Sequence, residues 1–284
     1  MSESRPTVDQ LRVAAEQGNA KAQCSLGLRY RYGDGVPQND AEAAKWYRKG
    51  AEQGYAEAQF FLGGLYFFGY GVEQNFTEAV KWFQKAAIQR HPQAQYYMGI
   101  CYDNGQGVGQ NPAEAVRWYR KAAEQGHKEA QYDLGGSYAN GEGVKKDMLE
   151  ASKWWRQSAE QGFDKAQFNL GRCYENGWGV ARDIAEAVKW YRLSADQGHD
   201  KAQYAMGCCY YMGSGVEKND AEAVKWFRMA AEQGNDKSQY NLGVCYCHGM
   251  GGLGKDHAEA RKWFLKAAEQ GNKDAQNALS ELED

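Results

Sequence analysis

The sequence predicts an all-α solenoid, a stack of helix–turn–helix repeats. Three recurring features predict it: a glutamine, a helix-capping pair and a set of glycines. The glutamine recurs every 36 residues, with a last interval of 37. It stands at Gln23, Gln59, Gln95, Gln131, Gln167, Gln203, Gln239 and Gln276. A period of this length is typical of one supersecondary unit stacked many times, and such stacks form long, shallow recognition surfaces more often than catalytic pockets.

The first helix of each repeat is predicted from apolar residues at four-residue spacing. In the first repeat, Ala22, Leu26 and Tyr30 mark one face of a helix over 20–32. Gly33 follows directly, and a glycine there can adopt the left-handed conformation that ends the helix, because it has no Cβ to clash.

The second helix of each repeat begins at an Asn or Asp that is followed three residues later by Glu. The capping side chain accepts a free backbone N–H of the first turn, and the Glu is expected to reach back to the cap. Each Glu also precedes a basic residue by three positions, which is a favourable helical pair. The capping pairs are Asn39/Glu42, Asn75/Glu78, Asn111/Glu114, Asp147/Glu150, Asp183/Glu186, Asn219/Glu222 and Asp256/Glu259.

A tryptophan stands one turn after each of these Glu residues, and we expect each ring to lie wedged between helices. Helices of about 12–15 residues are marginal alone, so stacking that buries these rings supplies the stability. The tryptophans are Trp46, Trp82, Trp118, Trp154, Trp190, Trp226 and Trp263. Glycine ends most second helices, but Arg90 and His91 replace that signal once. A differently shaped joint is expected there.

Single helices are predicted at both ends of the array. Residues 7–17 resemble a second helix without its partner, and residues 273–283 resemble a first helix in which polar residues replace Gly and Tyr. Polar outer faces are expected of terminal repeats. The sequence therefore predicts one domain over 1–284, with an N-terminal cap over 1–18, seven repeats over 19–271 and a C-terminal cap over 272–284.

The composition excludes several classes of function. Lys and Arg number 34, Asp and Glu number 37, the net charge is −3, and the two signs are interspersed. Phosphate backbones are bound by clustered basic residues, so nucleic acid is not an expected partner. No apolar run approaches the roughly 18 residues of a membrane span, and the segment from Met1 lacks the apolar core of a secretion signal. We expect a cytoplasmic protein, or a secreted or periplasmic one if a leader was removed.

Seven cysteines give an odd count, and four of them occupy the same repeat position, six residues after the glutamine. Neighbouring helices lie about 9–10 Å apart, beyond the Cα separation of about 7 Å that a disulfide spans. Buried, reduced thiols are therefore expected, and neither a metal nor another cofactor is predicted. A metal or redox sensor made of Cys209, Cys245, Cys247 and His248 is kept as an alternative. The four cysteines of the shared position are Cys101, Cys173, Cys209 and Cys245.

The repeated phrase resembles the Sel-1-like repeat family, a relative of the tetratricopeptide repeats. Its residues are small-Ala-Gln-x-x-Leu-Gly-x-x-Tyr, then Gly-x-Gly-Val, Glu-Ala-x-Lys-Trp and Ala-Glu-Gln-Gly, in seven near-complete copies. The resemblance implies a right-handed α/α superhelix. It also implies an adaptor or scaffold for partner proteins, in bacterial signalling, envelope processes and host contact or in eukaryotic protein quality control.

One branch of that family is secreted and carries a disulfide in each repeat, and some of its members have been labelled penicillin-binding. The chain departs from the branch, since Cys101 has no second cysteine downstream in its repeat. The motifs Ser-x-x-Lys, Ser-Asp-Asn and Lys-Thr-Gly do not occur in the sequence. We expect no enzyme, and a small-molecule-binding or hydrolytic protein of that type is the alternative function.

By analogy with tetratricopeptide repeats, the first helices line a concave face, and the residue after each glutamine points into its groove. Six consecutive copies of that position are aromatic, and large rigid rings are favoured at interfaces. They are Phe60, Tyr96, Tyr132, Phe168, Tyr204 and Tyr240. Packing against the next repeat explains the same pattern, so both interpretations stay open.

Two positions near the end of the first helix vary freely inside the strict repeat, so the fold does not dictate them. Tyr32, Phe67 and Phe68 stand there and are typical of an exposed interface patch. Asn104, Asn140 and Asn176 also stand there, with amides that donate and accept as a peptide backbone requires. Capping of the helix end explains the asparagines equally well. These residues predict a protein or peptide partner on the concave face.

Overall fold

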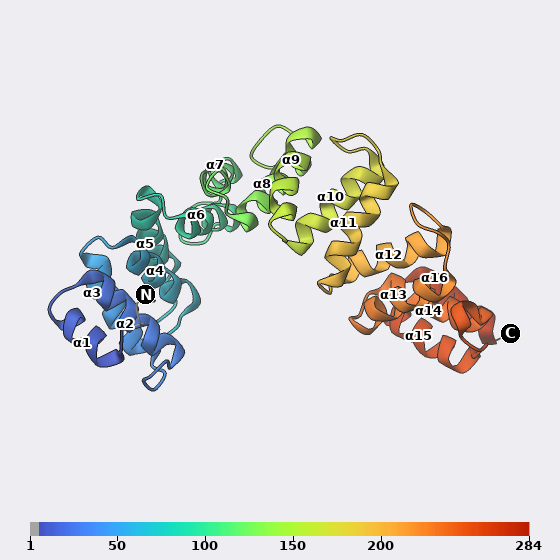
Figure 1. The fold of residues 1–284 in the computed structure, drawn as a ribbon, viewed down its shortest axis with the longest axis horizontal. Coiled ribbons are helices and arrows are strands. Elements are labelled where there is room, and N and C mark those ends of the chain that lie inside the picture. The colour runs from blue at the N-terminus through green and yellow to red at the C-terminus, as the bar shows by residue number, and fades with distance from the viewer. Residues whose placement is uncertain (1–5, 284) are drawn as a thin grey trace, which may run out of the picture. The chain divides into compact units, whose positions relative to one another are not determined.

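The computed structural model describes residues 6–283, which form sixteen α-helices, one short 3-10 helix and no strand (Figure 1). The all-α repeat fold predicted from the sequence is confirmed. The predictions for residues 1–5 and 284 lie outside the described residues. The α-helices are α1 (Val8–Glu16), α2 (Ala20–Tyr32), α3 (Asp40–Glu52), α4 (Ala56–Phe68), α5 (Phe76–Ile88), α6 (Pro92–Asn104), α7 (Pro112–Ala123), α8 (Lys128–Asn140), α9 (Met148–Glu160), α10 (Asp164–Asn176), α11 (Ile184–Asp196), α12 (Asp200–Met212), α13 (Asp220–Glu232), α14 (Asp236–His248), α15 (His257–Glu269) and α16 (Lys273–Glu283).

The helices form two compact units, α1–α8 in the unit that ends at Lys146 and α9–α16 in the unit that begins at Asp147. Within each unit, every helix packs on the next one along the chain, and Figure 1 shows them as successive helical hairpins. First and second helices alternate from α2 to α15, with α1 before them and α16 after them. The single domain over 1–284 stays a prediction.

The Asn and Asp caps of the second helices are confirmed, but the Glu of each capping pair acts differently from the prediction. Asn39 Oδ1 accepts the backbone N–H of Glu42 at 3.0 Å, and the six other caps do the same. The Glu42 carboxylate does not reach back to the backbone N–H of Asn39, because Asn39 donates that N–H to the carbonyl of Tyr30 at 2.8 Å. Glu42 accepts from Lys45 Nζ at 2.5 Å instead. The capping turn therefore ties the second helix to the last turn of the first.

Left-handed residues end the helices, as the glycines predict. Gly33 ends α2 with φ 71°, and Gly54 follows α3 with φ 89°. The prediction of a different joint after α5 is wrong for the backbone, since Arg90 adopts φ 66°. Its N–H donates to the carbonyl of Ala87 at 3.0 Å, as that of Gly54 donates to Ala51. The turn is kept because its hydrogen bonds need only the main chain, and Arg90 bears the strain that a Cβ brings to this conformation.

The centre of each repeat is the aromatic residue that directly follows the tryptophan. Tyr119 illustrates its packing: a Cβ added to Gly99 of the paired first helix would stand 2.4 Å from the Tyr119 ring. The glycine thus leaves room for a ring that the sequence analysis did not assign to the core. The buried residues of this position are Tyr47, Phe83, Tyr119, Trp155, Tyr191, Phe227 and Phe264.

The tryptophans themselves lie further out than expected. Their side chains project one position away from the buried ring on the same helix, and five of the seven indoles stay partly exposed. Trp82 and Trp226 are buried, and Trp46, Trp118, Trp154, Trp190 and Trp263 are half-buried.

The recurring glutamine is a buried hydrogen-bonding link between repeats. Gln59 Nε2 donates to the carbonyl of Ala51 at the end of α3 (3.1 Å). Gln59 Oε1 accepts from Gln89 Nε2, just beyond α5 (2.8 Å). An unpaired buried polar group costs about 1–3 kcal/mol, which accounts for the strict recurrence. The same link joins Gln23 to Gln53, Gln95 to Gln125, Gln167 to Gln197, Gln203 to Gln233 and Gln239 to Gln270.

Candidate interaction surface

The aromatic residues after the recurring glutamine are half-buried, and the structure shows what covers them. The Phe60 ring stacks on His91, the N-cap of α6, with centroids 4.9 Å apart. Tyr96 lies 4.7 Å from the ring of His127, the N-cap of α8, and 5.8 Å from the buried Tyr119. One side of each of these two rings therefore packs against the following repeat. Such packing was one of the two interpretations that the sequence left open, the other being a binding surface in the groove.

The second unit repeats this arrangement. Phe168 stacks on His199 at 5.0 Å and lies 5.7 Å from Tyr191. Tyr204 and Tyr240 lie 6.2 and 5.7 Å from the buried rings of Phe227 and Phe264. Tyr132, in the first unit, is half-buried like its equivalents. These residues hold the repeats together with one part of their surface and leave the other part at the first-helix face.

Two phenols of the first unit lie close to carboxylates, Tyr96 on a first helix and Tyr119 in the core. Tyr96 donates its O–H to Asp133 Oδ2 at 2.9 Å, and Tyr119 lies 3.5 Å from Asp103 Oδ2. Burial, and then the nearby negative charge of Asp133, raises the pKa of both phenols. Burial also raises the pKa of Asp103. The phenols are therefore neutral hydrogen-bond donors at physiological pH rather than bases.

The three asparagines at the ends of first helices are exposed. Asn176 Nδ2 donates to the carbonyl of Arg172 one turn back in α10, at 2.9 Å. Asn140 Nδ2 donates to Glu142 at 3.3 Å. The Asn176 contact is the local capping that the sequence left as an alternative. Binding of a peptide by Asn104, Asn140 and Asn176 stays a prediction.

The apolar residues at the ends of α2 and α4 divide into core and surface. Phe67 is buried beside Phe83 and belongs to the core. The others form an exposed group that we call the Tyr32 cluster. Its members are Tyr32, Phe68 and Tyr70, which are 71%, 48% and 43% exposed.

Arg31 orders the Tyr32 cluster. Its guanidinium carbon lies 4.2 Å from the centre of the Tyr70 ring and 6.0 Å from that of Tyr32. Phe68 stacks on Tyr70 with centroids 5.6 Å apart. Arg31 Nη1 also pairs with Asp40 Oδ1 at 2.8 Å. The cluster is therefore an exposed aromatic surface held by a fixed cation.

The structure leaves all seven cysteines as free thiols, five of them buried. Burial raises the pKa of Cys209 to about 12 and that of Cys245 to about 11, so both are protonated at neutral pH. Within residues 6–283, no three His, Cys, Asp or Glu side chains come together as a candidate metal site. The four residues considered for a sensor are thus not brought together as a ligand set.

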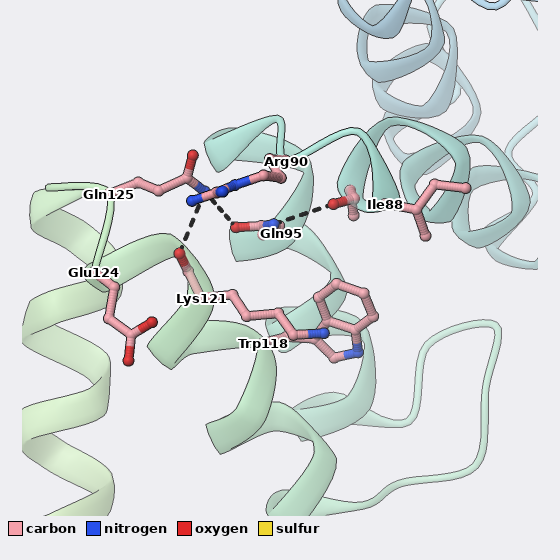
Figure 2. Close-up of a pocket in the computed structure, with 8 residues that line it drawn as sticks. Ile88, Arg90, Gln95, Trp118, Lys121, Glu124 and Gln125 are labelled. Carbon is pink, nitrogen blue, oxygen red and sulfur yellow. Dashed lines mark hydrogen bonds between the residues drawn. The ribbon is translucent and has the colours of Figure 1, made fainter.

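A pocket on the outer side of the first unit was missed by the sequence analysis. It lies between the end of α5 and α7, and Figure 2 shows its residues. The signal that would have found it is the departure of Ile88 and Arg90 from the repeated Glu-Gln-Gly. The sequence analysis interpreted Arg90, with His91, only as a change of joint shape and did not consider Ile88. We call it the outer pocket, and it is lined by Ala87, Ile88, Arg90, Gln95, Trp118, Lys121, Glu124 and Gln125.

The family of the chain follows from comparison with known proteins. The Sel1 repeat model matches seven consecutive segments, at residues 20–55, 56–91, 92–127, 128–163, 164–199, 200–235 and 236–272. The chain therefore belongs to the Sel1 repeat family, whose solenoid fold is typical of protein–protein interaction scaffolds. No curated protein matches it.

Two solved structures are similar over nearly the whole chain. One is c5321, described as a protective antigen present in uropathogenic Escherichia coli strains displaying an SLR fold. It is 40% identical with a TM-score of 0.92, and the match covers 98% of this chain and 59% of that one. The other is a Sel1 repeat protein from Oxalobacter formigenes, 34% identical with a TM-score of 0.77, covering 99% of this chain and 83% of that one. The chain thus spans little more than half the length of c5321.

None of the described helices is both long and apolar enough to cross a membrane.

Proposed function

We propose that the protein is a non-enzymatic scaffold that binds a partner protein or peptide through its first-helix face. The Tyr32 cluster is the observation that carries this proposal. Three aromatic side chains, 43–71% exposed, lie around Arg31 at the ends of two neighbouring first helices. Exposed apolar groups of this kind mark interaction sites in soluble proteins.

The chemistry of the cluster suits a protein partner. Aromatic rings bury a large area with few rotatable bonds, so a partner gains contact at a small entropic cost. The Arg31–Asp40 pair fixes the cation beside Tyr70 before any partner arrives. Half-buried Phe60, Tyr96 and Tyr132 continue the aromatic character along the first-helix face of the same unit.

The second unit supplies a comparable face through Phe168, Tyr204 and Tyr240. Asn104, Asn140 and Asn176 extend the proposed surface with exposed amides in both units. We place the protein in a reducing compartment, the cytoplasm, because seven unpaired thiols are most stable there.

Capture from lysate of the host, followed by mass spectrometry, tests the proposal. The baits are the wild type, Phe68→Ser with Tyr70→Ser, and Leu193→Ser as the matched control. Leu193 is 48% exposed, as is Phe68, but it lies on a second helix of the other unit. A partner held by the wild type and by the control, but lost by the cluster variant, is the expected result.

Equal capture by all three baits would contradict the placement of the site at the Tyr32 cluster. Absence of any captured protein would contradict the scaffold itself. Circular dichroism of each bait establishes that the variants are folded before they are compared.

A further inference from the structure

The end of α5 departs from the repeat at two of three positions. Elsewhere the second helices end in an acid, a glutamine and a glycine, whereas here Ile88 replaces the acid and Arg90 replaces the glycine. One negative charge is lost and one positive charge is gained, a change of +2 at this joint relative to the others. The joints that keep the acid and the glycine are at 16–18, 52–54, 124–126, 160–162, 196–198, 232–234 and 269–271.

Neither replacement is required by the fold. The backbone of this joint has the turn and hydrogen bonds found at Gly54. Among the described residues, Arg90 is the one non-glycine residue with a positive φ, and Ile88 is 70% exposed where its equivalents carry a solvated acid. A left-handed arginine costs stability, and an isoleucine that stays 70% exposed adds little to it. Strain of this kind is retained chiefly where function selects it.

Both side chains belong to the outer pocket, which has a volume of about 450 Å³. Figure 2 shows the Arg90 side chain extending toward the Gln125 amide, above Gln95 in this view, while Lys121 extends beside the indole of Trp118. Lys121 Nζ stands 3.9 Å from the centre of that indole. The two replaced residues therefore line one pocket together with a half-buried aromatic ring and a second cation.

The polar floor of the pocket is already satisfied. Gln125 Nε2 donates to Gln95 Oε1 at 2.6 Å, and Gln95 Nε2 donates to the carbonyl of Ala87 at 3.0 Å. A ligand consequently need not hydrogen-bond to the floor. It meets an apolar wall and two cations, Arg90 and Lys121, neither of which is ion-paired with another described residue.

We propose that the outer pocket binds a peptide segment that carries a large apolar side chain next to a carboxylate. The apolar side chain packs between Trp118 and Ile88, and the carboxylate pairs with the Arg90 guanidinium, which suits bidentate contact. Glu124, the one acid of the lining, disfavours a ligand that carries a second carboxylate on that side. The inference rests on the proposed scaffold function only in taking a peptide as the ligand, and it concerns a different face from the Tyr32 cluster.

A blocked hexapeptide, acetyl-Ala-Ala-Leu-Glu-Ala-Ala-amide, is the probe for this site. Its binding is followed through the indole N–H resonance of Trp118, assigned with the Trp118→Phe variant. We expect a saturable shift that weakens as salt is added. Replacing Glu by Gln or Leu by Ala in the peptide is expected to weaken binding by about tenfold each, since each change removes one of the two contacts.

The repeat itself provides the matched variants. Ile88→Glu with Arg90→Gly restores the common joint and is expected to weaken binding by more than about tenfold while the protein stays folded. The reverse change is Glu232→Ile with Gly234→Arg, beside Trp263 and Lys266, whose Nζ stands 4.2 Å from the indole centre. It is expected to produce a peptide-dependent shift at Trp263.

Two results would overturn the inference: no saturable shift in the wild type with peptide up to about 10 mM, where even millimolar affinities are visible, or equal affinity in the restored-joint variant. The Phe68→Ser, Tyr70→Ser protein separates this site from the proposed scaffold surface. It is expected to bind the peptide as the wild type does, whatever its capture from lysate shows.

Discussion

Trp118 and Tyr119 are neighbours in α7 and differ in what holds them. Tyr119 is buried against Gly99, and its O–H lies near Asp103. Trp118 is half-buried, with Lys121 beside one side of its indole and the outer pocket beside it. The inner ring is fixed by a glycine that leaves room for it alone, whereas the outer ring is covered by a side chain that can move. Stability is therefore expected to depend on the inner aromatic position and binding on the outer one.

The largest effect is expected from Tyr119→Ala. Removing a large buried aromatic side chain should lower the free energy of unfolding by about 3–5 kcal/mol. Trp118→Ala is the matched neighbour and should cost about 1–2 kcal/mol, because part of its area is already in water. Urea unfolding followed by circular dichroism compares the two. Equal losses would mean that both aromatic positions belong to one core.

Gly99→Ala should break the inner contact from the opposite side. A Cβ there would stand 2.4 Å from the Tyr119 ring, and overpacking of this kind costs about 1–3 kcal/mol, offset by about 1 kcal/mol of better helix propensity. We expect a net loss of up to about 2 kcal/mol in the same unfolding experiment. Gly64→Ala is the control, since a Cβ there meets nothing within 4 Å and should stabilise α4. A loss at Gly64 as large as that at Gly99 would refute the contact as the cause.

These contrasts also show which parts of the fold can be predicted from the sequence. The bounds of α2 and the caps at Asn39 and its equivalents follow from periodicity and capping chemistry, which act within one turn of chain. The choice of Tyr119 over Trp118 as the core residue depends on the facing Gly99, some 20 positions away in the sequence but adjacent in space. Spacing alone marks the positions of Trp118 and Tyr119 as apolar and does not show which of the two is more deeply buried.

The candidate site was predictable to a smaller extent. Exposure of Tyr32 and Phe68 agrees with the expectation of a surface patch, while the adjacent Phe67 points into the core, because a helix turns about 100° per residue. The outer pocket needed a different signal. Ile88 and Arg90 break the repeat together, and only the fold brings both into one pocket with Trp118.

His199→Asn should change how stability depends on pH, because His199 is a neutral cap that packs on the inner rings. His199 Nδ1 accepts the N–H of Ala202 at 3.2 Å, and Phe168 links its ring to Tyr191. Burial lowers the pKa of His199 below its usual value of about 6.5. Above pH 6.5 the His199 imidazole is neutral in both the folded and the unfolded chain. As the pH falls through it, the unfolded chain binds the proton first and stability is lost.

The loss from His199 can reach at most about 1.4 kcal/mol at pH 5.5, one unit below the ordinary pKa. Asparagine caps α14 at the equivalent Asn235 and does not titrate. Unfolding of the wild type and of His199→Asn at pH 7.5 and 5.5 should therefore diverge at the lower pH, with the variant less acid-sensitive. Parallel pH dependence of the two proteins would count against His199 as a neutral cap.

The smallest expected effect is a gain in stability from Arg90→Gly. Relief of the left-handed strain contributes about 1–2 kcal/mol, and the greater flexibility of glycine in the unfolded chain takes back about 0.5–1 kcal/mol. The net gain should be about 0.5–1 kcal/mol, and Gly54→Arg at the equivalent joint should cost a similar amount. Thermal unfolding of both variants measures the balance. A loss on Arg90→Gly would show that the arginine side chain stabilises the free protein by its own packing, and the strain at φ 66° would then need no ligand to account for it.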